Sequence, residues 1–241
     1  MNALCRPQGM GPVMKATTVW KIYPSGESSI QAVRGVDVQI EIGEMVAIMG
    51  PSGCGKTTLL NILSGIDEPN SGVVMVKGKP LFGISDNERT RMRAEYLGFI
   101  FQDFNLLPVL SAVENVELPL LLLGSSASEA RSGALEALSS VGLADRAEHL
   151  PSELSGGQQQ RVAVARALVH NPAVILCDEP TGNLDSATSN EILELLLRLN
   201  RERDTTFLIV THDPKIARRC SRTLHMSDGS IIDDVRHSEE E

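Results

Sequence analysis

The fold is decided by residues 50–57, which read GPSGCGKT. A short apolar run precedes them at residues 45–49, and residues 58–64 carry leucine and isoleucine at helical spacing after them. An apolar run bounded by turn residues is typical of a buried strand in a parallel sheet. The sequence therefore predicts a strand, a glycine-rich loop and a helix in that order. In this context the pattern GxxxxGK[ST] is typical of a loop that binds the phosphates of a nucleoside triphosphate.

Each residue type in this loop suits that chemistry. Glycines let successive N–H groups point inward, and the helix N-terminus adds a partial positive charge. Lys56 is expected to reach the β- and γ-phosphates, and Thr57 is expected to bind Mg²⁺. A purely structural glycine-rich turn is the alternative. The residues expected to contact nucleotide here are Gly50, Ser52, Gly53, Cys54, Gly55, Lys56, Thr57 and Thr58.

A second apolar run, residues 173–177, ends in the carboxylates Asp178 and Glu179. Paired acids at the end of a buried strand suit work on a metal–phosphate complex, with Asp178 holding Mg²⁺ through water and Glu179 polarising the attacking water. The alternative is that these acids cap the next helix, a task that Pro180 and Thr181 can perform without two buried charges. The guanine-specificity pattern NKxD is absent from the sequence, which disfavours a GTPase.

Around these two motifs the chain reads as an α/β protein interrupted by helices. Helices are predicted at residues 112–123 and 127–141, and another begins near Ser155. We expect a single domain over residues 13–233 with a helical insertion at about 103–165. We also expect a flexible N-terminal tail, residues 1–12, and an acidic C-terminal tail, residues 234–241. Further strands are expected at 207–210 and 223–226, and a further helix at 186–203.

Composition excludes several classes of protein. The 241 residues include 22 Lys and Arg against 31 Asp and Glu, a formal net charge of −9. General nucleic-acid binders need a basic surface that displaces counterions, so we expect no nucleic-acid partner. The longest apolar stretch, residues 118–123, is far shorter than the roughly 20 residues of a membrane helix, so any membrane role requires a partner.

The cysteines add information on compartment and reactivity. Cys5, Cys54, Cys177 and Cys220 lie far apart with no CxxC pair, which predicts neither a disulfide framework nor a zinc site and favours a reducing compartment. Cys54 lies inside the phosphate loop. We therefore expect thiol reagents to inhibit the protein and bound ATP to protect it.

Residues 154–158 read LSGGQ and predict a second anion-binding helix N-terminus, with Ser155 as its N-cap. Two separate anion sites in one chain are explained if two copies face each other and share ATP. With these motifs in this order, the chain resembles ATP-binding cassette (ABC) ATPases over residues 13–233. The resemblance implies a P-loop NTPase core with an antiparallel β subdomain and an inserted helical subdomain. It also implies ATP and Mg²⁺ as cofactors and a homodimer formed through ATP.

The resemblance assigns further roles. Tyr23 matches the aromatic residue that stacks on adenine, and Gln102 matches a glutamine that touches Mg²⁺ and the attacking water. Asp185 matches a loop that meets the opposite phosphate loop across the dimer, and His212 matches a histidine on the γ-phosphate. Without the resemblance, Tyr23 and His212 would be interpreted as structural. The resemblance implies Glu179, His212, Lys56 and Gln102 as catalytic, Thr57, Gln102 and Asp178 as metal contacts, and Ser155, Gly157 and Gln158 as contacts to the ATP held by the other copy.

Three segments, residues 101–108, 114–119 and 182–185, look like the LolD/MacB/FtsE group of these ATPases. That likeness implies an integral membrane permease partner, a peripheral location on the cytoplasmic face of the inner membrane, and cargo such as lipoproteins, peptides, macrolides or haem. Part of the apolar segment 106–110 is expected to line the docking groove of the partner: Leu106, Leu107, Val109 and Leu110. The alternatives are the ATPase of a conventional importer and a soluble ABC ATPase without a membrane partner. The DNA-repair type needs a longer insertion, and the translation-factor type needs two cassettes.

Overall fold

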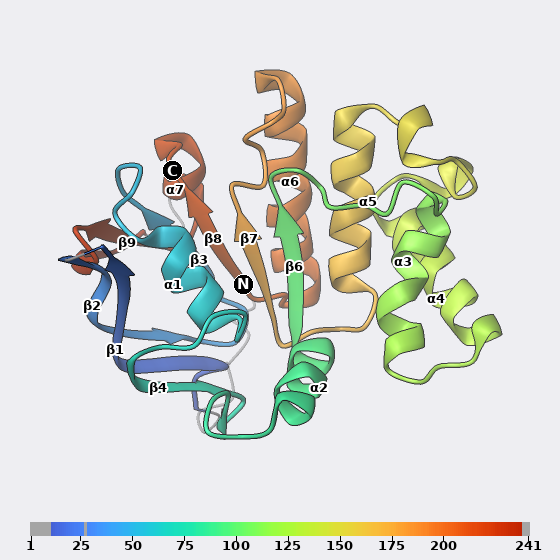
Figure 1. Ribbon diagram of the computed structural model, residues 1–241. Coiled ribbons are helices and arrows are strands. Elements are labelled where there is room, and N and C mark those ends of the chain that lie inside the picture. The colour runs from blue at the N-terminus through green and yellow to red at the C-terminus, as the bar shows by residue number, and fades with distance from the viewer. Residues whose placement is uncertain (1–10, 27, 238–241) are drawn as a thin grey trace, which may run out of the picture.

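The computed structural model describes residues 11–26 and 28–237, which form two sheets surrounded by helices (Figure 1). Within these residues the larger sheet has six strands, in the spatial order β10 (Ser230–Arg236), β9 (Arg222–Ser227), β3 (Met45–Met49), β8 (Phe207–Thr211), β7 (Val174–Asp178) and β6 (Leu97–Phe101). Neighbouring strands from β9 to β6 run parallel, and β10 pairs antiparallel with β9. The predicted α/β core is therefore confirmed.

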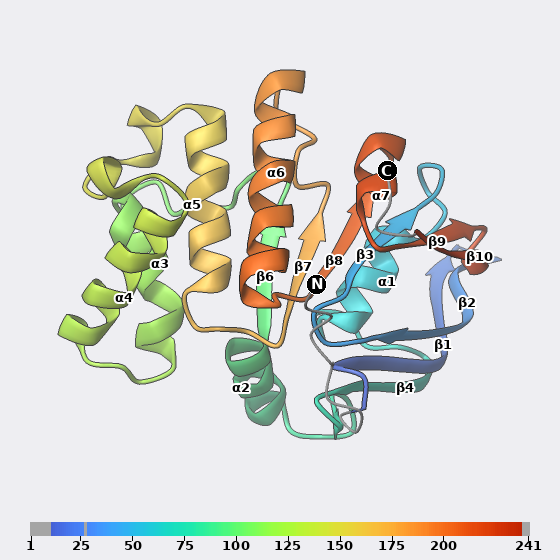
Figure 2. The same cartoon turned by 180° about the vertical axis from the view of Figure 1, so that it is seen from behind.

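Both faces of the parallel sheet are buried. Alternate side chains of each strand point to opposite faces, and each face packs in its own hydrophobic core. From β3, Met45 and Ala47 enter one hydrophobic core, while Val46 and Ile48 enter the other. A strand buried on both faces must be apolar at every position, which explains the unbroken apolar runs in the sequence. Helices α5 (Gly156–Leu168), α6 (Ser186–Arg203) and α7 (Pro214–Arg219) contribute to the first core, and α1 (Lys56–Leu63) contributes to the second (Figures 1 and 2).

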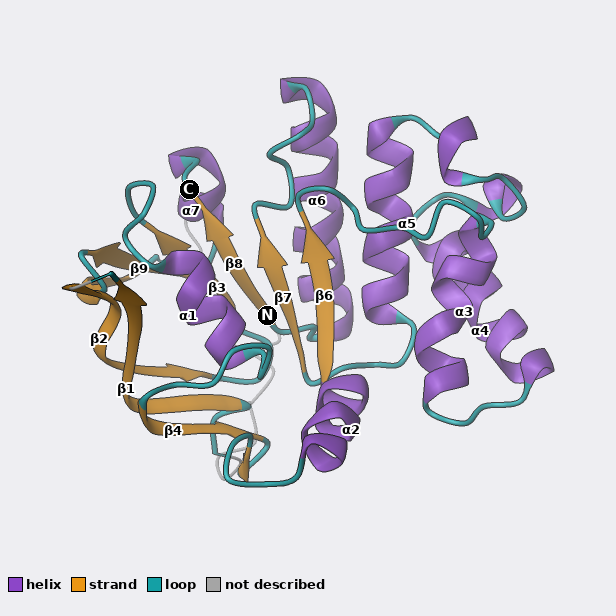
Figure 3. Ribbon diagram, in the orientation of Figure 1, coloured by secondary structure: helices purple, strands orange, loops and turns teal. Residues whose placement is uncertain are grey.

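The smaller sheet is the antiparallel β subdomain that the resemblance implied. Its order is β2 (Ser28–Ile40), β1 (Met14–Ser25), β4 (Ser71–Val76) and β5 (Lys79–Pro80). It shares the second core with α1, because Val19 and Val33 pack in the same cluster as Leu59. Figure 3 shows these strands gathered at one side of the molecule and the helical insertion at the other.

The helical insertion lies beyond β6, at the edge of the parallel sheet. Its buried hydrophobic residues are small or aliphatic, for example Val113, Val116, Ala134 and Leu138, so the helices pack closely on one another. Helix α2 (Asp86–Tyr96) precedes β6 and lies outside this group. The insertion contains α3 (Ala112–Leu122), α4 (Ala127–Ser140), the short 3₁₀ turns Ala144–Arg146 and Pro151–Glu153, and α5.

Two predicted boundaries, one of them approximate, fall inside elements of the structure. The acidic tail is expected to begin at residue 234, but β10 continues to Arg236. The insertion expected to end at 165 stops inside α5, which runs to Leu168. Of the expected N-terminal tail, residues 1–10 lie outside the described part of the chain.

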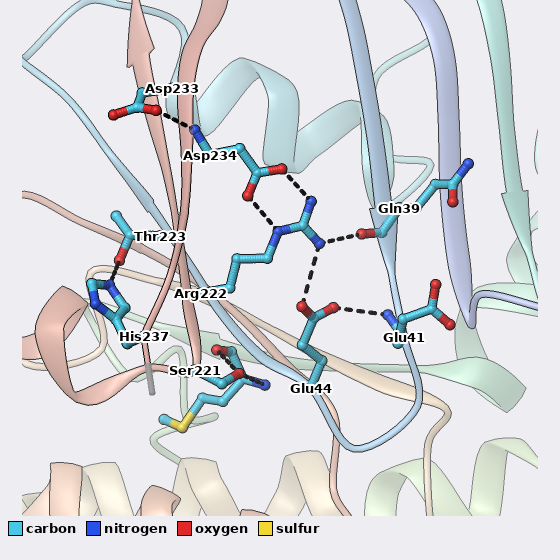
Figure 4. A network of polar contacts seen from close by, with 10 residues as sticks. Gln39, Glu41, Glu44, Ser221, Arg222, Thr223, Asp233, Asp234 and His237 are labelled. Atoms are coloured by element: carbon cyan, nitrogen blue, oxygen red, sulfur yellow. Dashed lines mark hydrogen bonds and ion pairs between the residues drawn. The ribbon is translucent and has the colours of Figure 1, made fainter. Parts of the chain in front are cut away.

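An ion-pair network explains why the chain continues as a strand through Asp234 (Figure 4). The Arg222 guanidinium donates through Nε and Nη2 to the two carboxylate oxygens of Asp234, at 2.7 Å each. Its Nη1 donates to the Gln39 carbonyl at 2.9 Å and to Glu44 Oε1 at 3.3 Å. The ion pair with Arg222 lowers the pKa of Asp234. One buried arginine therefore joins the C-terminal hairpin to β2 and to the turn before β3.

Replacing Arg222 with methionine is expected to lower the free energy of unfolding by about 3 kcal/mol, because the buried Glu44 carboxylate is left without its cation. The matched control is Arg219→Met, which breaks an exposed pair with Glu194 and should cost less than about 1 kcal/mol. Urea denaturation of the two variants provides the measurement. Equal losses in the two variants would contradict the structural role given to Arg222.

Candidate functional site

At two positions of the phosphate loop, Gly55 and Gly50, a side chain would collide with the backbone of a neighbouring strand. A Cβ at Gly55, whose φ is 105°, would lie 2.1 Å from the Ala32 carbonyl oxygen of β2. A Cβ at Gly50 would lie 2.1 Å from the Met226 carbonyl oxygen of β9. The loop is thus held between the antiparallel sheet and the C-terminal strands. Only glycine allows this close approach.

Lys56 and Thr57 open α1 directly after the loop. The Lys56 ammonium group is buried and donates to the carbonyls of Gly50 and Pro51, at 2.8 and 3.0 Å. The Thr57 hydroxyl donates to Asp178 Oδ1 at 3.4 Å. Burial, with a smaller contribution from neighbouring Glu179, raises the pKa of Asp178. A hydroxyl and a carboxylate facing each other across the loop are the hard oxygen ligands that Mg²⁺ prefers.

Glu179 follows Asp178 and turns away from the strand in a left-handed conformation, with φ of 46°. Its N–H donates to the Val210 carbonyl of β8 at 2.9 Å. Its Oε1 lies 2.9 Å from Nδ1 of His212, which follows the end of β8. A non-glycine residue with this backbone conformation carries strain that the surrounding structure must hold. The structure thus brings the two predicted catalytic residues into direct contact.

Gln102 lies at the carboxyl end of β6, beside the loop that follows Glu179. Its Nε2 donates to Asn183 Oδ1 at 2.9 Å, and Asn183 in turn donates to Asp103 at 2.6 Å. Gly182 leaves room for this arrangement, since a Cβ there would be 2.9 Å from the Gln102 side chain. The resemblance singled out Gln102 but did not predict its hydrogen bond with Asn183.

Helix α5 carries two further residues whose contacts with these loops the sequence does not predict. The fully buried Gln160 amide donates to the Pro180 carbonyl and, at 3.4 Å, to the Phe101 carbonyl. Arg166 donates to the carbonyls of Phe104 and Asn105, at 2.8 and 2.6 Å. The available signal was a polar or charged residue within the apolar stretch of an otherwise buried helix. These bonds attach α5 to the segments that follow both Gln102 and Glu179.

The N-terminus of α5 is the predicted second anion site. Ser155 is its N-cap, as expected: its Oγ accepts from the Gln158 N–H at 3.3 Å, while Gln158 Oε1 accepts from the Ser155 N–H at 2.9 Å. Gly157 packs closely on α6, because a Cβ there would meet Thr188 Cγ2 at 2.5 Å. This end of α5 therefore combines a capped first turn with a close helix contact.

Two predicted nucleotide contacts have other partners in this structure. Asp185 is the N-cap of α6 and accepts from the N–H groups of Ala187 and Thr188 at 3.0 Å each. Hydrogen bonds, the one from the Thr188 hydroxyl first, lower the pKa of Asp185. The Tyr23 hydroxyl donates to Asp67, and part of its ring is exposed. Their roles toward nucleotide remain predictions.

Residues 33–182 match the family model described as ABC transporter. The chain belongs to this family. It is 48% identical to the lipoprotein-releasing system ATP-binding protein LolD of Bordetella pertussis over 96% of this chain and 100% of that protein. It is 48% identical to the uncharacterized ABC transporter ATP-binding protein YbbA of Escherichia coli K12, over 89% of this chain and 94% of that protein.

A solved cassette, MJ0796, shares the fold with a TM-score of 0.85 and 44% identity, over 94% of this chain and 100% of that one. It is a dimer in a post-hydrolysis state bound to ADP and phosphate. This ABC family member is thus an ATP-binding protein and an ATPase. The predicted P-loop core with a helical insertion is confirmed. Among the residues that the structure describes, none of its helices has the length and hydrophobicity to cross a bilayer.

In this ABC ATPase the side chain of Cys54 is buried, although the residue is expected to contact nucleotide. The thiol is only 6% exposed and belongs to the core that includes α1. Any contact of Cys54 with nucleotide would therefore come from its backbone. Cys177 and Cys220 are also buried, and burial raises the pKa of Cys220 to about 12 and that of Cys177 as well. Because the thiolate is the reactive form, these two should be inert.

Inactivation by iodoacetamide is expected to proceed through Cys54 when the loop opens locally. ATP at about ten times its Kd should slow inactivation about tenfold, since only the free protein can open. Residual ATPase activity measured against time provides the rate. A Cys54→Ser variant should resist the reagent, and its inactivation at the rate of the unmodified chain would exclude Cys54 as the target.

Proposed function

We propose that two copies of this chain hold two ATP molecules between them and drive a membrane partner of LolD type. The observation that carries this proposal is the charge pattern at the helix N-termini. Of the seven α-helices within the described residues, five have a carboxylate at the N-cap or in the first turn, and only α1 and α5 have none. A carboxylate at this position neutralises the partial positive charge of the helix. Its absence leaves these two N-termini available for phosphate.

The two available N-termini serve different copies. Helix α1 lies on one face of the parallel sheet and α5 on the other, because their buried side chains belong to different cores. Both helices begin at the edge where β6, β7 and β8 end (Figure 1). A phosphate at α1 therefore lies apart from α5 of the same chain, and a second copy would supply the missing helix. The dimeric form of MJ0796 supports this arrangement.

The caps of the helices support the same conclusion. Ser85, Ser111, Ser126 and Ser155 each form a capping box, in which the serine and the third residue of the helix satisfy each other's N–H groups. In the first three the partner is a glutamate, and only in α5 is it a glutamine, Gln158. Glutamine keeps the cap but adds no negative charge beside an incoming phosphate.

The catalytic groups fit hydrolysis of the terminal phosphate. Glu179 would orient and polarise the attacking water, and His212 would hold Glu179 and contact the γ-phosphate. Lys56 would exchange its loop carbonyls for phosphate oxygens and stabilise their charge. Mg²⁺, held by Thr57 and Asp178 and contacted by Gln102, would supply electrostatic stabilisation of the phosphate oxygens.

A membrane partner would dock beside Gln102. Leu107 is 46% exposed and Val109 is 81% exposed, whereas Leu106 packs against the core. Exposed aliphatic side chains next to a catalytic loop favour contact with a partner helix. The LolD relative is named for a lipoprotein-releasing system, so we place this chain at the cytoplasmic face of the inner membrane, bound there through its permease.

The substitution Glu179→Gln tests the hydrolytic role. Turnover should fall at least about 100-fold, since a general base is lost, while ATP should trap the protein as a dimer. Phosphate release and size-exclusion chromatography with ATP are the two measurements. The control is Glu202→Gln at an exposed position of α6, which should behave as the unmodified chain. Unimpaired turnover in Glu179→Gln would exclude this residue as the base.

The substitution Gln158→Glu tests the sharing of ATP between copies. The capping box and thermal stability should be preserved, but repulsion between the new carboxylate and phosphate should lower ATP-driven dimerisation and hydrolysis at least about tenfold. The mirror control is Glu129→Gln in the equivalent box of α4, which should cost about 0.5 kcal/mol of stability and leave ATPase activity unchanged. Normal dimerisation of Gln158→Glu would mean that α5 does not face phosphate.

A further inference from the structure

The segment Asp67–Asn70, between α1 and β4, is attached to four successive residues of β1. The Asn70 N–H donates to the Trp20 carbonyl at 2.8 Å, and the Ile22 N–H donates to Asn70 Oδ1 at 2.7 Å. The Lys21 ammonium group donates to Asp67 Oδ1 at 2.5 Å. The Tyr23 hydroxyl donates to the other carboxylate oxygen of Asp67. Asp67 thus holds the side chains of two residues of one strand, Lys21 and Tyr23.

Asp67 and Lys21 together fix the orientation of the Tyr23 ring. The Lys21 ammonium group lies 4.9 Å from the centroid of the ring, a cation–π distance. It also donates to the Glu68 carbonyl at 2.6 Å, so its own position is set by two bonds. The ring is still 37% exposed, which leaves part of it accessible. A tyrosine near the tip of a hairpin is therefore held at its hydroxyl and along one face.

The same carboxylate residue is tied to the helix that begins at the phosphate loop. The N–H groups of Ile66 and Asp67 donate to the Asn61 carbonyl of α1, at 2.9 and 3.1 Å. Since α1 begins at Lys56, a short and rigid path joins the Tyr23 ring to the phosphate loop. The distance between the two is set by one helix and one carboxylate.

We infer that Asp67 is a positioning residue that holds Tyr23 at the correct height for the base of a nucleotide whose phosphates occupy the loop. The inference rests on the predicted stacking of Tyr23 on adenine. Asp67 itself contacts neither base nor phosphate and acts through Tyr23. Without it, the ring is free to rotate about its side-chain bonds, and stacking must then bear the entropic cost of ordering it.

The charge of Asp67 is essential to this arrangement. Burial raises the pKa of Asp67, but hydrogen bonds from Lys21 and Tyr23 outweigh it, so the pKa lies below its ordinary value and the group is ionised. Burial first and the Asp67 hydrogen bond second raise the pKa of Tyr23, which keeps its hydroxyl protonated as a donor. The ammonium group of Lys21 neutralises the carboxylate, so the pair places no net charge near a nucleotide.

The test compares binding of ADP with binding of pyrophosphate, which lacks the base, by isothermal titration calorimetry. Asp67→Ala should raise the Kd for ADP about five- to tenfold, as expected for one charged hydrogen bond and the ordering it provides. The Kd for pyrophosphate should stay within about twofold. Tyr23→Ala should show the same selectivity, and the double variant should be no weaker than Tyr23→Ala alone, because both changes remove one interaction.

A spectroscopic measurement separates positioning from a general structural effect. The chain has two tyrosines, so in a Tyr96→Phe background the ultraviolet absorbance of tyrosinate reports Tyr23 alone. Asp67→Ala should lower the pKa of Tyr23 in that background. The matched control is Asp86→Ala, which removes an exposed carboxylate paired with Arg89 on α2 and should alter neither binding nor the tyrosine titration.

Three outcomes would overturn the inference, and they are distinguishable. If Tyr23→Ala leaves ADP binding unchanged, the stacking role of Tyr23 is wrong and the role of Asp67 falls with it. If Tyr23→Ala weakens ADP binding but Asp67→Ala does not, only the positioning role is wrong. If Asp67→Ala weakens ADP and pyrophosphate equally, Asp67 supports the phosphate loop through α1 and does not position the base.

Discussion

The close approach of three backbones around the phosphate loop is the constraint on which the rest of the structure depends. Gly55 is pressed against the Ala32 carbonyl of the antiparallel sheet, and Gly50 against the Met226 carbonyl of β9. The loop can wrap an anion only while both neighbours stay in place. The Arg222 network provides that, since it joins β9, β10, β2 and the turn before β3 through one buried guanidinium group. Stability and phosphate binding therefore share the same supports.

The placement of carboxylates at the helix N-termini is consistent with the same requirement, that of leaving room for phosphate. In general, a carboxylate near a helix N-terminus stabilises the fold and excludes anions at once. The described chain has such a carboxylate at five of its helix N-termini, for example at Asp185, Asp213 and Glu129. The N-termini of α1 and α5 carry no carboxylate. Helix α5 is stabilised instead by its neutral Ser155–Gln158 cap. N-termini without a carboxylate at just these two helices are expected if anion binding determines the sequence there.

Local patterns were sufficient to predict the α/β core and to locate candidate site residues along the chain. The strand at residues 45–49 and the helix at 186–203 have the predicted limits, because apolar runs and periodicity report burial directly. Contacts between distant segments left no such pattern. The Glu179–His212 contact depends on adjacent strands β7 and β8, and the burial of the Cys54 thiol depends on a loop path that the motif does not specify. The extension of β10 through Asp234 depends on a partner twelve residues earlier, Arg222.

Helix α5 shows what such distant contacts achieve. Its first turn carries the predicted anion site, while Gln160 and Arg166 bind the carbonyls of residues on either side of Gln102 and directly after Glu179. A buried amide that loses its partner costs about 1–3 kcal/mol, so α5 cannot shift by itself without that penalty. Movement of its N-terminus toward a phosphate must carry the catalytic loops with it. The position of Glu179 is thereby linked to the state of a helix that lies on the opposite face of the sheet from α1.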